Sequence, residues 1–175
     1  MHISITVNDR IELTEVREND KPNFIRYLND AAVFNNTLMI PSPYTETSAD
    51  FFLNLCRESE KNHGFIANFA IRERATGNLI GGCGRFVKDI YKDEIGYWIG
   101  EPFRNRGVMS AVINALCQYL FDTTDLVRIE AIVFSDNIAS AKTLEKAGFQ
   151  QEGYLRKYVF KKGEMKDVFI YSRLK

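Results

Sequence analysis

The chain has 175 residues, enough for one domain with a substantial apolar core. Its 23 basic and 23 acidic residues balance, so it lacks the basic excess of nucleic-acid-binding proteins and gives no reason to expect a membrane surface as partner. No apolar stretch is long enough to cross a bilayer, and the first residues do not resemble a signal peptide.

Cysteine and histidine usage argues against a disulfide framework and against a metal centre. Cys56, Cys83 and Cys117 are scattered and odd in number, so we expect buried, reduced thiols in a cytoplasmic protein. His2 and His63 are far apart and no paired cysteine spacing occurs. A zinc site is therefore not expected.

The N-terminal part of the chain predicts strands followed by two helices. Apolar and polar residues alternate over 3–7 and again over 11–13, which predicts strand structure with a turn at Asn8-Asp9. Asn19-Asp20 can cap a first helix that carries Phe24, Ile25, Tyr27 and Leu28, with Pro22 tolerated in its first turn. The stretch 35–47 holds two prolines and is expected to be irregular. A second helix is expected to start at Thr47 or Ser48, with one apolar face formed by Phe51, Phe52 and Leu55.

The rest of the chain alternates strands with two further helices. The expected strands cover 65–72, 79–87, 94–99, 127–134 and two segments around 162–163, and the expected helices cover 109–121 and 138–147. Antiparallel runs of strands with helices between some of them indicate a mixed α/β domain. We expect this single domain to span residues 1–175.

The segment from Tyr97 to Leu116 carries the main functional signal. A short apolar strand runs through a basic, glycine-containing turn into an apolar helix. Such a turn directs backbone N–H groups at the positive end of a helix, which suits a phosphate-bearing ligand. Gly107 allows an anion to approach the backbone closely, and Arg104 and Arg106 add positive charge. Taken alone, the pattern also fits an ordinary basic loop, and it lacks the motifs of nucleoside triphosphate loops.

The turn resembles a signature of the GNAT superfamily of N-acetyltransferases. Arg104-x-x-Gly107-x-Met109 is similar to Gln/Arg-x-x-Gly-x-Gly/Ala, the turn that holds the pyrophosphate of acetyl-CoA in that family. Met109 departs from the usual Gly or Ala, but its backbone N–H remains available and its side chain could line the CoA groove. The resemblance implies acetyl-CoA as cosubstrate, with no metal, bound by Arg104, Asn105, Arg106, Gly107, Val108, Met109 and Ser110.

A second segment resembles the same family. A β-branched and aromatic run over 127–134 precedes Asn137-x-x-Ser140, and Glu145-Lys146-x-Gly148-Phe149 follows. The C-terminal pattern from Glu152 to Tyr171 is similar to the branch named for the ribosomal-protein N-terminal acetyltransferases RimJ and RimL. The family fold is a mostly antiparallel sheet flanked by helices, whose fourth and fifth strands splay apart to admit the pantetheine arm.

The resemblance also implies roles at the acetyl group. The backbone N–H of Ile99 would polarise the thioester carbonyl, and Trp98 and Ile99 would line the acetyl and pantetheine channel. For the side chains alone, plain strand core is the stronger interpretation. Many relatives use a Tyr as proton donor to the thiolate, but Leu144 occupies that position. Ser140, one turn earlier, is the candidate donor, with simple packing as the alternative.

The acceptor amine must lose a proton before it attacks. Glu94 lies just before the expected reacting strand and is the candidate base, although an isolated solvated Glu is the commoner case. Glu152 and Tyr154 are weaker alternatives. Asn137 would hydrogen-bond the pantetheine amides, cap the helix, or do both.

Two functions of different class follow from these residues. The first is an acetyl-CoA-dependent N-acetyltransferase that acts on a primary amine, with a protein N-terminus as the favoured acceptor. A polyamine, an amino-acid derivative or an antibiotic is the alternative acceptor. The second is a CoA-binding protein without turnover. The sequence leaves the acceptor open, and it leaves open whether the protein is a monomer or a homodimer.

Overall fold

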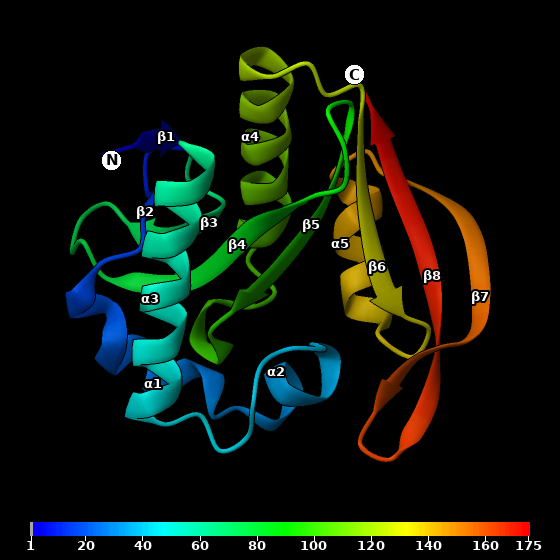
Figure 1. Ribbon diagram of the computed structural model, residues 1–175, viewed down its shortest axis with the longest axis horizontal. Helices are drawn as coiled ribbons and strands as arrows, with labels where there is room; N and C mark the ends of the chain where they lie inside the picture. Colours follow the sequence, from blue (N-terminus) through cyan, green and yellow to red (C-terminus); the bar gives the residue numbers. More distant parts are fainter. Residues whose placement is uncertain (1) are drawn as a thin grey trace. The chain divides into compact units, whose positions relative to one another are not determined.

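The computed structural model describes residues 2–175 and has the expected mixed α/β architecture (Figure 1). Within those residues, eight strands follow one another in the sheet in the order β1-β2-β3-β4-β5-β6-β8-β7, and most neighbouring pairs are antiparallel. The chain divides into two compact units. Unit 1 holds the residues up to Gly84 and Tyr97–Val108, and unit 2 holds Arg85–Gly96 and Met109–Lys175.

Two strands, β4 and β5, run from one unit into the other. Unit 1 contains β1 (Ser4–Thr6), β2 (Ile11–Glu15), the 3-10 turn η1 (Glu18–Asp20), α1 (Lys21–Leu28), α2 (Ala31–Asn36), α3 (Glu46–His63), β3 (Asn68–Glu73), the first part of β4 (Leu79–Val87) and η2 (Glu101–Phe103). Unit 2 contains most of β5 (Lys92–Ile99) and of α4 (Val108–Thr123), together with β6 (Arg128–Phe134), α5 (Ile138–Lys146), β7 (Gln150–Lys161) and β8 (Glu164–Leu174).

The expected strands are confirmed, and the N-terminal strand is a hairpin that turns at Asn8-Asp9. The side chain of Asn8 stabilises this turn, because Asn8 Oδ1 accepts hydrogen bonds from the N–H groups of Arg10 and Ile11 at 2.9 and 3.0 Å. β2 continues the sheet by pairing with β3, with Leu13 opposite Ile71. Both of these side chains are fully buried.

Asp20 does not cap α1 with its side chain, contrary to the expectation from the sequence. Its carboxylate is buried and forms an ion pair with Arg72 on β3, at 2.8 and 2.9 Å. Arg72 also donates to Thr14 Oγ1 and to the carbonyl oxygens of Glu15 and Gly77. Burying the Arg72 charge without a partner would cost more free energy than leaving α1 without a side-chain cap, so Asp20 pairs with Arg72.

The prediction for 35–47 was incomplete. The predicted apolar face of the next helix was right for Phe52, which packs against the buried cluster around Phe24, and wrong for Phe51 and Leu55. Helix α2 begins before the irregular stretch and ends at Asn36. Helix α3 starts at Glu46, one residue before the expected start, with Thr45 and Ser48 forming a capping box. Ala49 and Leu53 face the interior, whereas Phe51 is 71% exposed and Leu55 46% exposed. The neighbouring aromatic residues Phe51 and Phe52 made the inward-facing side of this helix hard to recognise in the sequence.

The core of unit 1 lies between its helices and its strands. It contains Phe24 and Leu28 of α1, Val33 of α2 and Ala49 of α3, and the indole of Trp98 packs against it. The Trp98 ring centroid lies 5.9 Å from that of Phe24. A Cβ on Gly82 would come within 2.7 Å of Trp98 Nε1, so a glycine is required for this approach.

Unit 2 is built on a long antiparallel ladder of β6, β8 and β7 (Figure 1). The parallel pairing of β5 with β6 joins Lys92–Glu94 to Arg128–Glu130, the first three residues of each strand. Such a short ladder agrees with strands that splay apart. Within the unit, Tyr171 of β8 donates to Glu145 of α5 at 3.1 Å, which fixes this helix on the sheet.

Two of the three thiols are buried as expected. Cys83 and Cys117 are buried and Cys56 is partly exposed, and all three are free. Burial raises the pKa of the Cys117 thiol to about 12, so this group stays protonated at neutral pH.

Candidate active site

The glycine turn enters helix α4 through two left-handed residues. Asn105 has φ 60° and Gly107 has φ 73°, and α4 begins at Val108. Asn and Gly are the residues that adopt this backbone most readily. The first N–H groups of a helix have no carbonyl partner within that helix, so the turn and α4 together form an anion-binding geometry.

The side chains of the turn differ in their exposure. Arg106 is exposed, whereas Met109 is only 8% exposed. The Met109 side chain is therefore buried, and its backbone forms part of the first turn of α4. Substitution of the usual small residue by Met109 is accommodated by this packing.

A cavity of about 380 Å³ lies beside the turn, within unit 1. Arg106, Gly107 and Val108 line one side, and the β1–β2 turn lines another. The volume falls in the range of small-molecule pockets. The residues of the β1–β2 turn could not be predicted as part of this cavity, because their place beside Gly107 depends on how the hairpin packs. They are Asn8, Asp9, Arg10 and Ile11.

Ile99 is held by the side chain of Arg104. The Nε and Nη2 atoms of Arg104 both donate to the carbonyl oxygen of Ile99 at 3.3 Å. Gly100 follows, and its N–H donates to the carbonyl of Ile80 at 2.9 Å. The backbone around Ile99 is therefore fixed on both sides. The Trp98 indole packs with the unit 1 core, which accounts for this side chain without a ligand.

Glu94 of unit 2 has a cationic neighbour. Lys88 Nζ lies 2.8 Å from Glu94 Oε2, and the Glu94 side chain is 19% exposed. The hydrogen bond with Glu94 raises the pKa of Lys88, which keeps the ammonium charged. Glu130 is the register partner of Glu94 on β6, and it pairs with Arg128 at 2.7 Å.

The two alternative bases are occupied by other contacts. Hydrogen bonds from Arg128 and Ser172 lower the pKa of Glu152 to about 2, which makes its carboxylate a weak base. The Tyr154 hydroxyl donates to Asp167, and this bond raises the pKa of Tyr154. A tyrosine held in its protonated form suits proton donation better than proton removal.

Asn137 caps helix α5 as the sequence predicts. Its Oδ1 accepts from the backbone N–H of Ser140 at 3.2 Å. The Asn137 side-chain oxygen is therefore engaged at the helix start, which leaves its amide nitrogen as the donor toward a ligand. Ser140 lies in the first turn of α5 and Leu144, on the same helix face, is fully buried.

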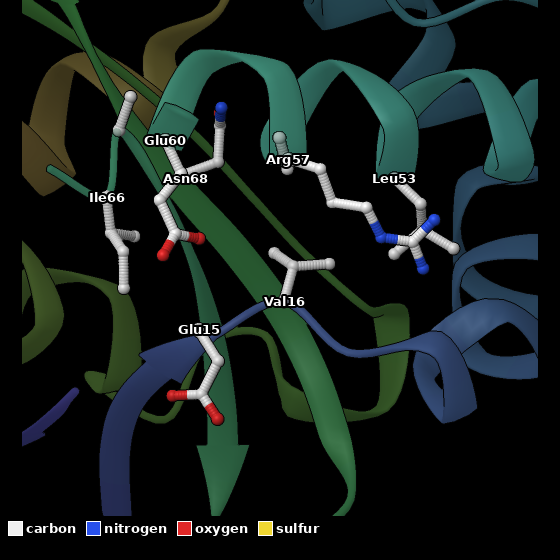
Figure 2. A pocket seen from close by; sticks show the side chains of 9 residues that line it. Glu15, Val16, Leu53, Arg57, Glu60, Ile66 and Asn68 are labelled. Carbon is white, nitrogen blue, oxygen red and sulfur yellow. The ribbon is translucent and has the colours of Figure 1, made fainter. Parts of the chain in front are cut away.

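A second cavity in unit 1 is too small for a substrate. It has about 40 Å³ and is lined by residues of β2, of α3 and of the start of β3 with the segment before it, among them Glu15, Arg57 and Asn68 (Figure 2). This volume accommodates a few water molecules at most.

Residues 2–175 hold neither a group of side chains suited to a metal ion nor a helix suited to crossing a membrane. No three His, Cys, Asp or Glu side chains among those residues gather where they could hold a metal ion. None of the helices in that part of the chain has the length and apolar character needed to span a bilayer.

Comparison with protein families and curated proteins gives consistent matches. The GNAT acetyltransferase domain matches residues 10–150. The chain is 32% identical to the uncharacterized N-acetyltransferase p20 of Bacillus licheniformis over 169 residues, which is 95% of this chain and 94% of p20. Over 82 residues it is 33% identical to the L-amino acid N-acetyltransferase AaaT of Escherichia coli, covering 47% of this chain and 51% of AaaT. Over 117 residues it is 27% identical to the ribosomal protein uS5-alanine N-acetyltransferase of the same species, covering 67% and 54%.

Solved structures share the fold over nearly the whole chain. An acetyltransferase of the GNAT family from Bacillus anthracis has a TM-score of 0.85 at 25% identity, covering 98% of each chain. RimL, a ribosomal L7/L12 α-N-protein acetyltransferase solved with coenzyme A, has a TM-score of 0.88 at 20% identity, also covering 98% of each chain.

Proposed function

This chain belongs to the GNAT acetyltransferase family and is an acetyl-CoA-dependent N-acetyltransferase, and we propose that its acceptor is the α-amine of a protein N-terminus. The observation that carries the donor half of the proposal is the turn at Asn105 and Gly107 that leads directly into α4. The pyrophosphate of acetyl-CoA binds there, and the exposed Arg106 adds a positive charge. Arg104 acts through its side chain, because its backbone N–H donates to the carbonyl of Glu101 at 3.2 Å. The turn residues Asn105–Ser110 act mainly through their backbone.

The reaction is a direct attack of the neutral amine on the thioester carbonyl. The N–C bond forms and the C–S bond breaks, so that the products are the acetylated amine and CoA with a free thiol. The N–H of Ile99 donates to the carbonyl oxygen as negative charge develops on it. Arg104 supports this role, since it holds the neighbouring carbonyl of Ile99.

The two proton transfers are assigned to residues of unit 2. Glu94 accepts the proton that the amine loses, directly or through water. Its ion pair with Lys88, at 2.8 Å, holds the carboxylate in place. Ser140 supplies a proton to the leaving thiolate in place of the Tyr that Leu144 replaces. Asn137 holds the pantetheine arm through its amide nitrogen while its oxygen caps α5.

The choice of an α-amine is supported by the relatives. One relative is named as an alanine N-acetyltransferase of ribosomal protein uS5, RimL is named as an α-N-protein acetyltransferase, and AaaT is named as an L-amino acid N-acetyltransferase. These acceptors share an α-amine, whose pKa near 8 makes the neutral form more abundant at neutral pH than that of a lysine-type amine. The resemblance of the C-terminal segment to RimJ and RimL favours the peptide over the free amino acid.

Thiol release from acetyl-CoA with matched acceptors tests the proposal. The panel contains short peptides with Ala, Ser or Met first, the same peptides with a blocked N-terminus, free L-amino acids, and spermidine. We expect the highest kcat/KM for an unblocked peptide and none for its blocked form, even when that form contains lysine. A higher kcat/KM for free amino acids would establish the second candidate function, which the relationship to AaaT favours. Preference for spermidine would contradict both.

A further inference from the structure

Asp30 connects helix α2 to the phosphate turn within unit 1. Its Oδ1 accepts from the N–H of Ala32 at 2.7 Å and thereby caps α2. Its Oδ2 pairs with Nη2 of Arg104, the first residue of the turn motif. The two side chains are 21% and 28% exposed, so the pair is largely shielded from solvent. One carboxylate therefore serves both the helix start and the turn.

The guanidinium of Arg104 is held along one edge. Nε and Nη2 face the carbonyl of Ile99, and Nη2 also faces Asp30. The other terminal nitrogen, Nη1, donates to no residue in the described range 2–175, so its two N–H groups remain for a phosphate oxygen. Arginine is suited to this arrangement because its planar fork can bind three acceptors in fixed directions.

The order of helix α2 depends on its cap residue Asp30, whereas helix α1 is ordered mainly by packing. It has six residues, and Val33 is its buried residue, whereas α1 buries Phe24 and Leu28. A helix this short is unstable in isolation, so its order comes from its cap and its packing. Helix α1 is also fastened to the segment after Ile99 by a ring contact, because Tyr27 and Phe103 lie 5.8 Å apart.

We propose that Asp30 is a positioning residue whose ion pair with Arg104 makes the order of helix α2 depend on occupation of the phosphate turn. This inference rests on the proposed seat of acetyl-CoA. A phosphate on Nη1 restricts the Arg104 side chain, Arg104 restricts Asp30, and Asp30 restricts the first turn of α2. Helix α2 leads into the irregular stretch 37–45, so the coupling also transmits donor binding to that segment.

Hydrogen exchange read by mass spectrometry, with CoA as the probe and the full chain as the sample, tests this coupling. The informative variant is Asp30→Asn, because Asn is as good an N-cap as Asp but lacks the charge. Glu46→Gln is the control, since it removes an exposed acid from the first turn of α3 in the same unit. Thermal unfolding of each variant verifies that it is folded.

In the parent protein we expect CoA to slow exchange in peptides covering 104–112 and also, by about fivefold or more, in peptides covering 31–37. In Asp30→Asn the CoA effect persists over 104–112 and disappears over 31–37. Glu46→Gln behaves like the parent. The readout is the change on adding CoA, so a variant that merely loosens α2 in both states does not mimic the result.

The outcomes separate the two proposals. Protection over 104–112 without any CoA effect over 31–37, or an equal effect over 31–37 in Asp30→Asn, overturns the coupling and leaves the donor site standing. Absence of protection over 104–112 in the parent protein overturns the donor site and the coupling together.

Discussion

Lys88 Nζ and Glu94 Oε2 form an ion pair at 2.8 Å on the sheet of unit 2. The pair places a positive charge beside Glu94, the proposed base. Glu130 lies opposite Glu94 on the neighbouring strand β6 and forms its own ion pair with Arg128. Glu94 therefore has a cationic partner of its own, and so does the carboxylate beside it in register.

Replacement of Glu94 by Gln should depress kcat/KM at neutral pH by about a hundredfold, the usual range for loss of a general base. The parent kcat/KM should rise with pH to a plateau, because a free amine must lose its proton. The variant should recover part of its rate at higher pH, where neutral amine is more abundant. Identical pH profiles for the two proteins would exclude Glu94 and turn attention to Tyr154 or a water chain.

Replacement of Glu152 by Gln should leave kcat/KM at neutral pH close to the parent value and change acid stability instead. Hydrogen bonds lower the pKa of Glu152 from 4.5 to about 2 in the folded protein, so its stabilising contribution is complete above pH 4.5. That contribution fades as the pH falls toward 2. Urea unfolding should therefore show a difference between parent and variant at pH 6 that shrinks between pH 4.5 and 2. The difference is modest, because the side chain is 42% exposed. A constant difference over that range would contradict the assignment.

Replacement of Gly107 by Asp should weaken CoA binding by about tenfold or more, which is about 1.4 kcal/mol. The change adds a negative charge where the pyrophosphate is proposed to bind, and it places a side chain on a left-handed backbone. Gly163→Asp is the matched control, because Gly163 also has positive φ and open space around its Cα, but lies in the β7–β8 turn. Calorimetry with CoA compares the two. Equal affinity in a folded Gly107→Asp variant would exclude the turn as the binding site.

Replacement of Ser140 by Ala should lower kcat by roughly tenfold or more, about 1.4 kcal/mol of barrier, with little change in CoA affinity. The capping bond survives in this variant, because Asn137 accepts from the backbone N–H of residue 140. Thr143→Ala removes a hydroxyl from the same helix, one that donates to the carbonyl of Ala139, and serves as the control. Parent-like turnover in Ser140→Ala would leave Ser140 with a packing role.

Replacement of Arg72 by Met should destabilise the protein by about 3–5 kcal/mol, since it leaves the buried carboxylate of Asp20 without its partner. The double variant Arg72→Met with Asp20→Asn should lose less than the sum of the two single losses. Urea unfolding of all four proteins measures this coupling. Additive losses would show that the two residues act independently.

The strands and the glycine turn before α4 were predictable because each depends on local pattern. The strand at 79–87 was predicted with its observed bounds, and the glycine and basic residues marked the turn before α4. Asn137 was predictable as a cap for the same reason, because capping involves only the next three residues.

The parts that escaped prediction depend on contacts between distant residues. Asp20 resembles a helix cap in the sequence, but its carboxylate forms an ion pair with Arg72, a residue far along the chain. Helix α2 is too short to show a period, and its cap gains its second partner from Arg104. The inward face of α3 was misread because Phe51 is a large apolar residue that points outward. In each case tertiary contact overrides a local preference.

The two adjacent glycines of β4 differ in what stands in the way of a larger residue. A Cβ on Gly82 would meet the Trp98 indole, which is a side chain and can itself be replaced. A Cβ on Gly81 would come within 2.7 Å of the Trp98 carbonyl oxygen and 3.2 Å of the Ile99 Cα, which are backbone atoms. Positions 82 and 98 can therefore change together during evolution or engineering, for example Gly82→Ala with Trp98→Leu. Position 81 has no such compensating exchange, so enlarging it would displace the Ile99 amide, which is proposed to hydrogen-bond the thioester carbonyl.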